Sequence, residues 1–215
     1  MDSAESICER ITQLLMQTLA VRLQKKTKEN CFTLEQHWAR VWSVTMAVGI
    51  NQMPGLAVVT ISDRCAAGSQ VDTTGPAVAR VLQELWPEET IGRGLVPDNE
   101  DAIATLLHEL CHNEYELILT AGGTGLGPRD VTPEATRRVI HREAPGLAEA
   151  MRSQTAAANQ LAWLSRAVAG LCGKTLIVNL PGSETGAVEC LRVILPLLAH
   201  ALEVAGGGSH HPVSR

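Results

Sequence analysis

The chain has 215 residues, of which 45% are hydrophobic, and a formal net charge of −5. This length suits one sizeable α/β domain with an appendage, and the mildly acidic charge excludes the strongly basic surface typical of nucleic-acid binders. No apolar run approaches the roughly 20 residues that a transmembrane helix needs, so we expect no membrane span.

The N-terminal segment, residues 1–54, differs in pattern from the rest of the chain. An apolar stripe at i, i+4 spacing from Ile7 to Leu19 predicts an amphipathic helix over residues 3–23. Two interpretations stay open: a docking or partner-binding arm, or a loosely attached extension without catalytic residues. We favour the extension, because chain termini are often poorly tied down.

From Leu56 onward, predicted strands alternate with predicted helices. Leu56–Ile61 is a short, continuous apolar, β-branched run of the kind found in strands buried on both faces, and Leu117–Thr120 is a second predicted buried strand. Two further segments are strand candidates: Ile91–Val96 and Lys174–Val178. Helical spacing predicts helices at Pro76–Leu85, Asn99–Cys111 and Thr185–Val204. This alternation predicts an α/β domain over residues 55–205 with a parallel sheet flanked by helices. Residues 206–215 are rich in Gly, Ser and His and predict a disordered tail.

Polar residues follow four of the predicted strands. Ser62 and Asp63 follow the first strand, Asp98 the second, a Gly-rich loop the third, and the segment Asn179–Ser183 a later one. Parallel sheets bind ligands in the crevice at the carboxyl ends of their strands. We therefore expect these four segments to meet at one edge of the sheet.

The Gly-rich loop, Gly122–Gly127, holds four glycines in six residues. Glycine permits positive φ and close approach of a ligand to backbone amides, which can form an anion-binding nest, and Thr124 adds a hydroxyl. The loop matches neither the dinucleotide pattern G-x-G-x-x-G nor Walker A, which requires a following Lys. Alone, it indicates either an anion site or a tight turn.

Acidic residues close to this loop favour the anion site. Asp98 and Asp130 each follow a strand, and Glu134 lies near a predicted helix start at Thr132-Pro133. An Asp before a helix is often only a cap, but two carboxylates beside an anion-binding loop suit Mg²⁺ with bound phosphates. Three cations could balance a polyanionic ligand or be solvated surface charges: Arg129, Arg166 and Lys174.

Histidines and cysteines give weaker indications. His108 and His112 lie one helical turn apart, but without a third ligand we expect exposed helix histidines and no metal site. The six cysteines are scattered without metal-ligand spacing. They favour reduced thiols in a cytoplasmic protein.

Several motifs follow one another in an order that resembles a known family. They are Thr60-Ile61-Ser62-Asp63, Asp72-Thr73-Thr74-Gly75, Pro97-Asp98, the block from Thr120 to Thr136, Glu143-Ala144-Pro145-Gly146, Leu164-Ser165-Arg166 and Asn179-Leu180-Pro181-Gly182-Ser183. Over Leu56–Val204, the chain resembles the molybdopterin adenylyltransferases, relatives of the N-terminal domain of gephyrin.

The resemblance implies a three-layer molybdopterin-binding fold, assembled as a homotrimer. It implies transfer of AMP from Mg-ATP to the phosphate of molybdopterin with release of pyrophosphate, and a separate partner protein that inserts molybdate. The alternatives are a non-catalytic molybdopterin-binding paralogue and a trimeric scaffold domain.

The resemblance also assigns site residues. Asp98 and Asp130 match the two catalytic acids, and we expect them to bind Mg²⁺. The matching nucleotide- and pterin-binding positions are Ser62, Asp63, Asp72, Gly75, Gly122, Gly123, Thr124, Gly125, Glu134, Ser165, Arg166, Asn179, Pro181, Gly182 and Ser183.

Overall fold

The computed structural model describes residues 55–208. The helix predicted for residues 3–23, and the whole of segment 1–54, lie outside the described residues. So does the predicted tail from residue 209 onward.

One six-stranded sheet forms the centre of the domain, in the order β2-β1-β3-β6-β5-β4. The strands are β1 (Leu56–Ile61), β2 (Ile91–Val96), β3 (Leu117–Ala121), β4 (Arg142–Glu143), β5 (Ala169–Cys172) and β6 (Thr175–Leu180). β1 pairs in parallel with β2 and β3, and β3 pairs in parallel with β6. β5 and β4 continue the sheet as antiparallel strands, so the predicted, mostly parallel sheet is confirmed.

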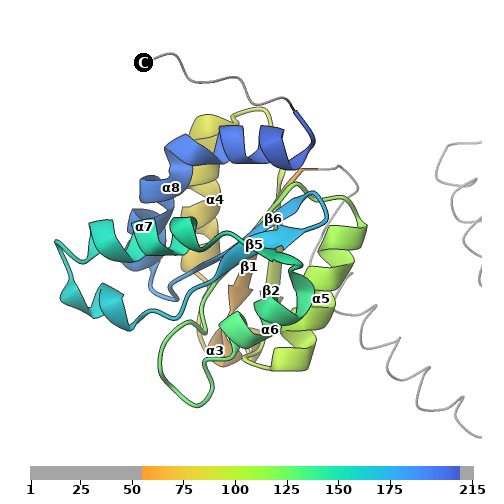
Figure 1. Cartoon of the computed structure of the whole chain (residues 1–215). Coiled ribbons are helices and arrows are strands. Elements are labelled where there is room, and N and C mark those ends of the chain that lie inside the picture. The colour runs from red at the N-terminus through yellow and green to blue at the C-terminus, as the bar shows by residue number, and fades with distance from the viewer. Residues whose placement is uncertain (1–54, 209–215) are drawn as a thin grey trace, which may run out of the picture. The chain divides into compact units, whose positions relative to one another are not determined.

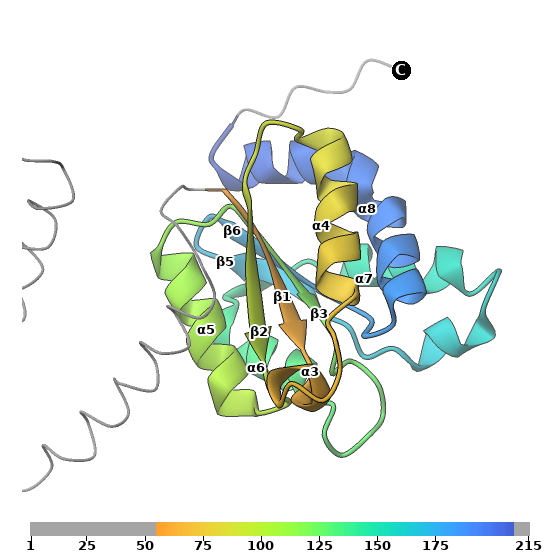
Figure 2. The ribbon, with the colours of Figure 1, turned by 180° about the vertical axis from the view of Figure 1, so that it is seen from behind.

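Helices cover both faces of this sheet (Figures 1 and 2). The helical elements are α3 (Asp63–Ala66), α4 (Thr74–Leu85), α5 (Glu100–His112), α6 (Thr132–Val139), α7 (Pro145–Thr155), the 3₁₀ helix η1 (Gln160–Leu164) and α8 (Glu184–Ala205). On one face, α4, α7 and α8 pack against the sheet in one apolar cluster. On the other face, α5 and α6 pack against it in a second cluster. The predicted three-layer architecture is therefore confirmed.

The central strands form because their side chains are apolar on both faces. All residues of β1, β3 and β6 are buried, as expected for strands that lie between two helical layers. α5 places Ile103, Leu106 and Leu107 in the second cluster. Asn99 caps the helix, because its side chain accepts a hydrogen bond from the Ala102 amide.

Some predicted boundaries were wrong. α4 begins at Thr74 instead of Pro76, and Leu85, which was expected to face the core, is 38% exposed. β6 runs to Leu180, so Asn179 belongs to a strand and not to a loop. Its polar side chain is tolerated there because it is fully hydrogen-bonded, as described below.

The segment from β4 to β5 contains elements that periodicity did not predict: β4, α7, η1 and β5. No helix among residues 55–208 combines the length and apolarity that crossing a bilayer requires.

Candidate functional site

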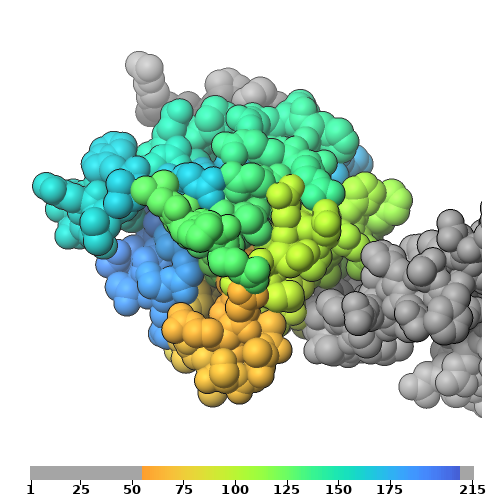
Figure 3. Space-filling model, turned by 90° about the horizontal axis from the view of Figure 1, so that it is seen from below, coloured from red at the N-terminus to blue at the C-terminus, as the bar shows by residue number. Residues whose placement is uncertain are grey.

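Four loops meet at the carboxyl edge of the parallel strands, as predicted. They line a cavity of about 590 Å³ that we call the acidic cavity. It is lined by Ser62 and Asp63 after β1, Asp98 after β2, Gly122 and Gly123 after β3, and Gly182 and Ser183 after β6. Figure 3 views the molecule from this side, where the segment after β1 (orange) lies beside the Gly-rich loop (green).

A second cavity, of about 330 Å³, lies between the Gly-rich loop, α7, η1 and the start of α8. We call it the helical cavity. Its wall is largely apolar, with Ala148 and Met151 from α7 and Leu161 from η1, while Arg152 supplies a cation. Four residues line both cavities: Gly123, Asp130, Gly182 and Ser183. The two compartments therefore adjoin, and Asp130 is the one carboxylate that lines both.

The Gly-rich loop depends on two glycines for its path. Gly122 and Gly123 have φ values of +123° and +60°. A Cβ on Gly122 would lie 2.1 Å from the Ile61 carbonyl oxygen, and one on Gly123 would lie 2.3 Å from Thr132 Oγ1. Within the described residues, the amides of Gly123, Thr124 and Gly125 donate to no protein acceptor. Gly123 lies in the shared wall, and Thr124 and Gly125 line the helical cavity, so these N–H groups are suited to bind an anion where the cavities adjoin.

Asp98 is fixed by reciprocal hydrogen bonds with Asp63. The Asp63 amide donates to Asp98 Oδ2 at 2.8 Å, and the Asp98 amide donates to Asp63 Oδ1 at 3.0 Å. Arg129 Nη2 donates to Asp63 Oδ2 at 2.6 Å, which ties the Gly-rich loop to the loop after β1. Asp130 Oδ2 accepts a hydrogen bond from the Gly127 amide at 2.8 Å.

Each of the two candidate metal ligands keeps one carboxylate oxygen for a further partner. Asp98 Oδ1 and Asp130 Oδ1 accept no hydrogen bond from any residue in 55–208. That part of the chain holds no cluster of three or more His, Cys, Asp or Glu side chains arranged to bind a metal alone. Mg²⁺ is commonly held by one or two carboxylates and by substrate phosphates, and this donor set fits that pattern.

The amino termini of two helices also face the acidic cavity. Ser183 caps α8, accepting a hydrogen bond from the Gly186 amide, and Gly182, Ser183 and Glu184 line the cavity. Thr74, at the start of α4, donates from Oγ1 to the Gly182 carbonyl oxygen at 3.1 Å. The positive end of a helix dipole at a cavity wall stabilises bound anions.

Most predicted site residues line one or both cavities, but four line neither. The lining ones are Ser62, Asp63, Asp72, Asp98, Gly122, Gly123, Thr124, Gly125, Asp130, Ser165, Pro181, Gly182 and Ser183. Asp72 is already hydrogen-bonded, because its carboxylate accepts from the Thr60 hydroxyl and the Gly75 amide. The four residues that line neither cavity are Gly75, Glu134, Arg166 and Asn179.

Those four residues make contacts within the protein. Gly75 packs so closely that a Cβ there would lie 2.5 Å from Thr60 Oγ1. Glu134 pairs with Arg166, while Asn179 lies in the core and donates to the hydroxyl of Thr120.

Sequence reasoning missed two cations and the helix that carries one of them. Arg64 lines the acidic cavity, and Arg152 of α7 lines the helical cavity. The spacing of Ala148, Met151 and Thr155, all on the cavity side of α7, was the signal for that helix.

Lys174, by contrast, lines a separate cavity with Cys111. His108 and His112 are exposed on α5, as expected, with ring centroids 5.3 Å apart.

Fold and site together define the class of this protein: an α/β domain with two adjoining cavities at the carboxyl edge of its sheet, one rich in carboxylates and the other largely apolar. Comparisons narrow this class to a family. Residues 57–200 match the family described as a probable molybdopterin binding domain. The chain belongs to this family, as the motifs predicted.

The similar proteins carry names from molybdenum cofactor biosynthesis. Molybdopterin adenylyltransferase of Helicobacter pylori (strain J99) is 38% identical over 156 residues, covering 71% of this chain and 88% of that protein. The molybdenum cofactor synthesis protein cinnamon of Drosophila melanogaster is 41% identical over 150 residues, which cover 69% of this chain but only 25% of cinnamon.

The solved structures agree with this assignment. The molybdopterin biosynthesis enzyme MoaB of Thermus thermophilus is 45% identical, with a TM-score of 0.66, and the match covers 72% of this chain and 98% of that one. This protein is thus a member of a molybdenum cofactor biosynthesis family that contains named enzymes.

Proposed function

We propose that this domain transfers AMP from Mg-ATP to the phosphate of molybdopterin and releases pyrophosphate. The observation that supports it most directly is the wall shared by the acidic and helical cavities, at Gly123, Asp130, Gly182 and Ser183. A reaction between two bound substrates needs adjoining sites, with the reacting atoms held at their junction.

The acidic cavity suits the phosphates of the nucleotide. Asp98 and Asp130 would hold Mg²⁺ through their free carboxylate oxygens, and the ion supplies charge neutralisation of the phosphates when bound. The amides of Gly123, Thr124 and Gly125 would donate to phosphate oxygens at the shared wall. The helical cavity, with its apolar wall and Arg152, suits a flat heterocycle with a polar edge.

The chemical step is a displacement at phosphorus. A phosphate oxygen of molybdopterin attacks the α-phosphorus of ATP, and a P–O bond forms there as the bond to pyrophosphate breaks. We assign no general base, because a phosphate monoester is already an anionic nucleophile. Assembly as a homotrimer and a molybdate-inserting partner belong to this proposal through the resemblance alone, and a cytoplasmic location belongs to it through the scattered cysteines.

The test is an adenylation assay with molybdopterin, ATP and Mg²⁺, read by the mass of the product. Asp130→Asn keeps an acceptor for the Gly127 amide but removes the charge, so we expect kcat to fall on the order of 100-fold or more. Asp101→Asn is the matched control, because Asp101 is an exposed acid on α5 that pairs with Arg138. It should leave the rate unchanged.

The results of this assay distinguish between the proposed function and its alternatives. An active Asp130→Asn enzyme would remove this residue from the mechanism. A wild-type protein that binds molybdopterin without forming product would support a non-catalytic paralogue or a scaffold domain.

A further inference from the structure

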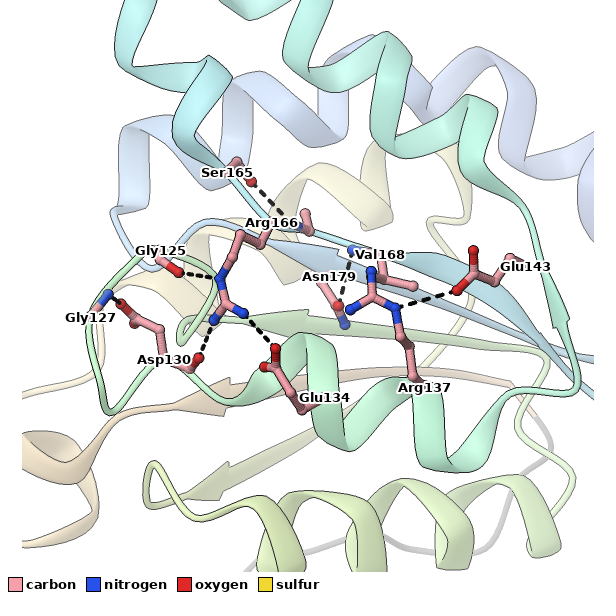
Figure 4. Close-up of polar contacts among 11 residues, drawn as sticks. Gly125, Gly127, Asp130, Glu134, Arg137, Glu143, Ser165, Arg166, Val168 and Asn179 are labelled. Atoms are coloured by element: carbon pink, nitrogen blue, oxygen red, sulfur yellow. Dashed lines mark hydrogen bonds and ion pairs between the residues drawn. The ribbon is translucent and has the colours of Figure 1, made fainter.

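One arginine contacts both ends of the segment Thr124–Asp130, which overlaps the Gly-rich loop. Arg166 lies between η1 and β5, and it is half-buried, with 34% of its side chain exposed. Its Nε donates to the Gly125 carbonyl oxygen at 2.7 Å, its Nη2 donates to the Asp130 carbonyl oxygen, and its Nη1 donates to Glu134 Oε1. Figure 4 shows the guanidinium between these three acceptors.

The main chain of Arg166 adds a fourth contact, because its amide donates to the Thr124 carbonyl oxygen at 2.9 Å. The loop from Thr124 to Asp130 is therefore fastened at its beginning and at its end by a single residue. A planar guanidinium can do this because its five N–H groups point in fixed directions, whereas a Lys ammonium places its donors at one point.

Arg166 itself lines neither the acidic nor the helical cavity. The residues that Arg166 fixes do line the cavities: Thr124 and Gly125 line the helical cavity, and Asp130 lines both. Its contacts use carbonyl oxygens, which leaves the amides of Thr124 and Gly125 free to face a ligand. Its charge is paired with Glu134, so the clamp adds little net charge to the loop.

We propose that Arg166 is a positioning residue: it holds the Gly-rich loop and Asp130 in the geometry that binding and catalysis require, without touching either substrate. Its effect on turnover rests on the proposed function, whereas its effect on the loop does not.

The first experiment is hydrogen exchange of the full chain, which does not depend on activity. The amides of Gly127 and Asp130 are hydrogen-bonded within the loop, to Asp130 Oδ2 and to the Gly127 carbonyl oxygen respectively. In Arg166→Met, we expect them to exchange about tenfold faster, while β3 amides keep their wild-type rate. Arg166→Lys should lie in between, and it is the deciding variant if Arg166→Met does not fold.

Arg138→Met is the matched control. Arg138 lies on α6 and pairs with Glu100 and Asp101, outside the Gly-rich loop, so this variant loses an ion pair without loosening the loop. Loop amides that exchange at the wild-type rate in Arg166→Met would overturn the proposal. So would an increase spread equally over the loop and β3, because that pattern reports general destabilisation.

The second readout is the adenylation assay. We expect Arg166→Met to lower kcat on the order of 100-fold with a smaller change in the KM for ATP, because small displacements of positioning groups are costly to rate. If a variant has a loosened loop but the same kcat as the wild-type protein, the proposed effect of Arg166 on catalysis is overturned. If the wild-type protein itself lacks activity, the proposed function fails and the exchange comparison still decides whether Arg166 is the clamp.

Discussion

Among single residues, Gly122 is the most tightly constrained in the site. It joins β3 to the Gly-rich loop at a φ of +123°, which side-chain-bearing residues rarely adopt. Its amide donates to the Leu180 carbonyl oxygen, and its carbonyl accepts from the Thr132 hydroxyl. A residue held on both sides in this way cannot relax when a side chain is added.

We therefore predict that Gly122→Ala lowers the free energy of unfolding by about 2–4 kcal/mol, through the strained φ and the contact with the Ile61 carbonyl oxygen. Gly146→Ala is the control, because a Cβ at Gly146 in α7 meets nothing within 4 Å. It should be neutral or stabilising by up to about 1 kcal/mol. Urea unfolding measures both, and equal stabilities would mean that the loop adapts freely.

Between elements, the side chain of Asn179 joins four segments. From β6, its Nδ2 donates to Thr120 Oγ1 of β3 at 2.9 Å and to Thr136 Oγ1 of α6 at 2.8 Å. Its Oδ1 accepts from the Val168 amide just before β5 at 3.2 Å. Asn179 is fully buried, so water cannot replace these bonds. The amide thus fixes α6, whose first turn carries Glu134, against the sheet.

We predict that Asn179→Ala lowers the free energy of unfolding by about 2–4 kcal/mol, because it leaves a buried amide and two hydroxyls without their partner. The comparison is Asn99→Ala, which removes the exposed cap of α5 and should cost about 1 kcal/mol. Chemical denaturation of both variants checks the order. A smaller loss at position 179 than at position 99 would contradict the role assigned to the buried network.

The helices and strands that the sequence predicted well are those with a clear hydrophobic pattern or turn signal. β1 and β2 were predicted with the observed bounds, because β1 is a continuous apolar run and β2, although it contains Arg93 and is only partly buried, is closed by the turn signal Pro97-Asp98. β4 has only two residues, and both are exposed, so no hydrophobic pattern marks it. It forms because β5 supplies a partner, which is a tertiary cause.

The positions of site residues after strands were predicted, but the contacts of several side chains were not. Residues directly after parallel strands, such as Ser62 and Asp98, could be placed at one edge from topology alone. Arg166 and Glu134 were predicted to bind a ligand, but topology did not predict that they pair with each other or that Arg166 donates to carbonyl oxygens of Gly125 and Asp130. Which way a side chain turns depends on the acceptors around it, and those come from segments distant in sequence.

In the molecule as a whole, the thiols of Cys111 and Cys172 lie at the opposite end of the strands from the acidic cavity, whereas Cys190 lines the helical cavity. Cys172 pairs with Thr175 at the start of β6, the end remote from the cavities of the site. Cys172 lines a separate cavity together with Cys111 and Tyr115. Ionisation of Cys111 or Tyr115 should therefore affect the stability of the domain before it affects the chemistry of the site.

Burial raises the pKa of the Cys111 thiol from 9.0 to about 12, with a hydrogen bond to Cys172 as the next cause. Burial also raises the pKa of Tyr115 and of Cys190. In each case the folded state holds its proton more tightly than the unfolded chain. The stabilisation is complete below about pH 9 and is lost as the pH rises toward about 12, because the unfolded chain ionises first.

We accordingly predict that the urea midpoint falls steadily between about pH 9 and 10.5, and that the fall is smaller in the double variant Cys111→Ala/Cys190→Ala, which removes two of the three protons involved. Ion pairs with acidic side chains also raise the pKa values of Arg138 and Arg192, but guanidinium groups stay protonated throughout this window. Urea unfolding at half-unit pH steps measures the slope. An equal slope in the two proteins would assign the alkaline sensitivity to Tyr115 or to the net charge of the chain, whereas a midpoint that rises with pH would contradict the buried thiols as its source.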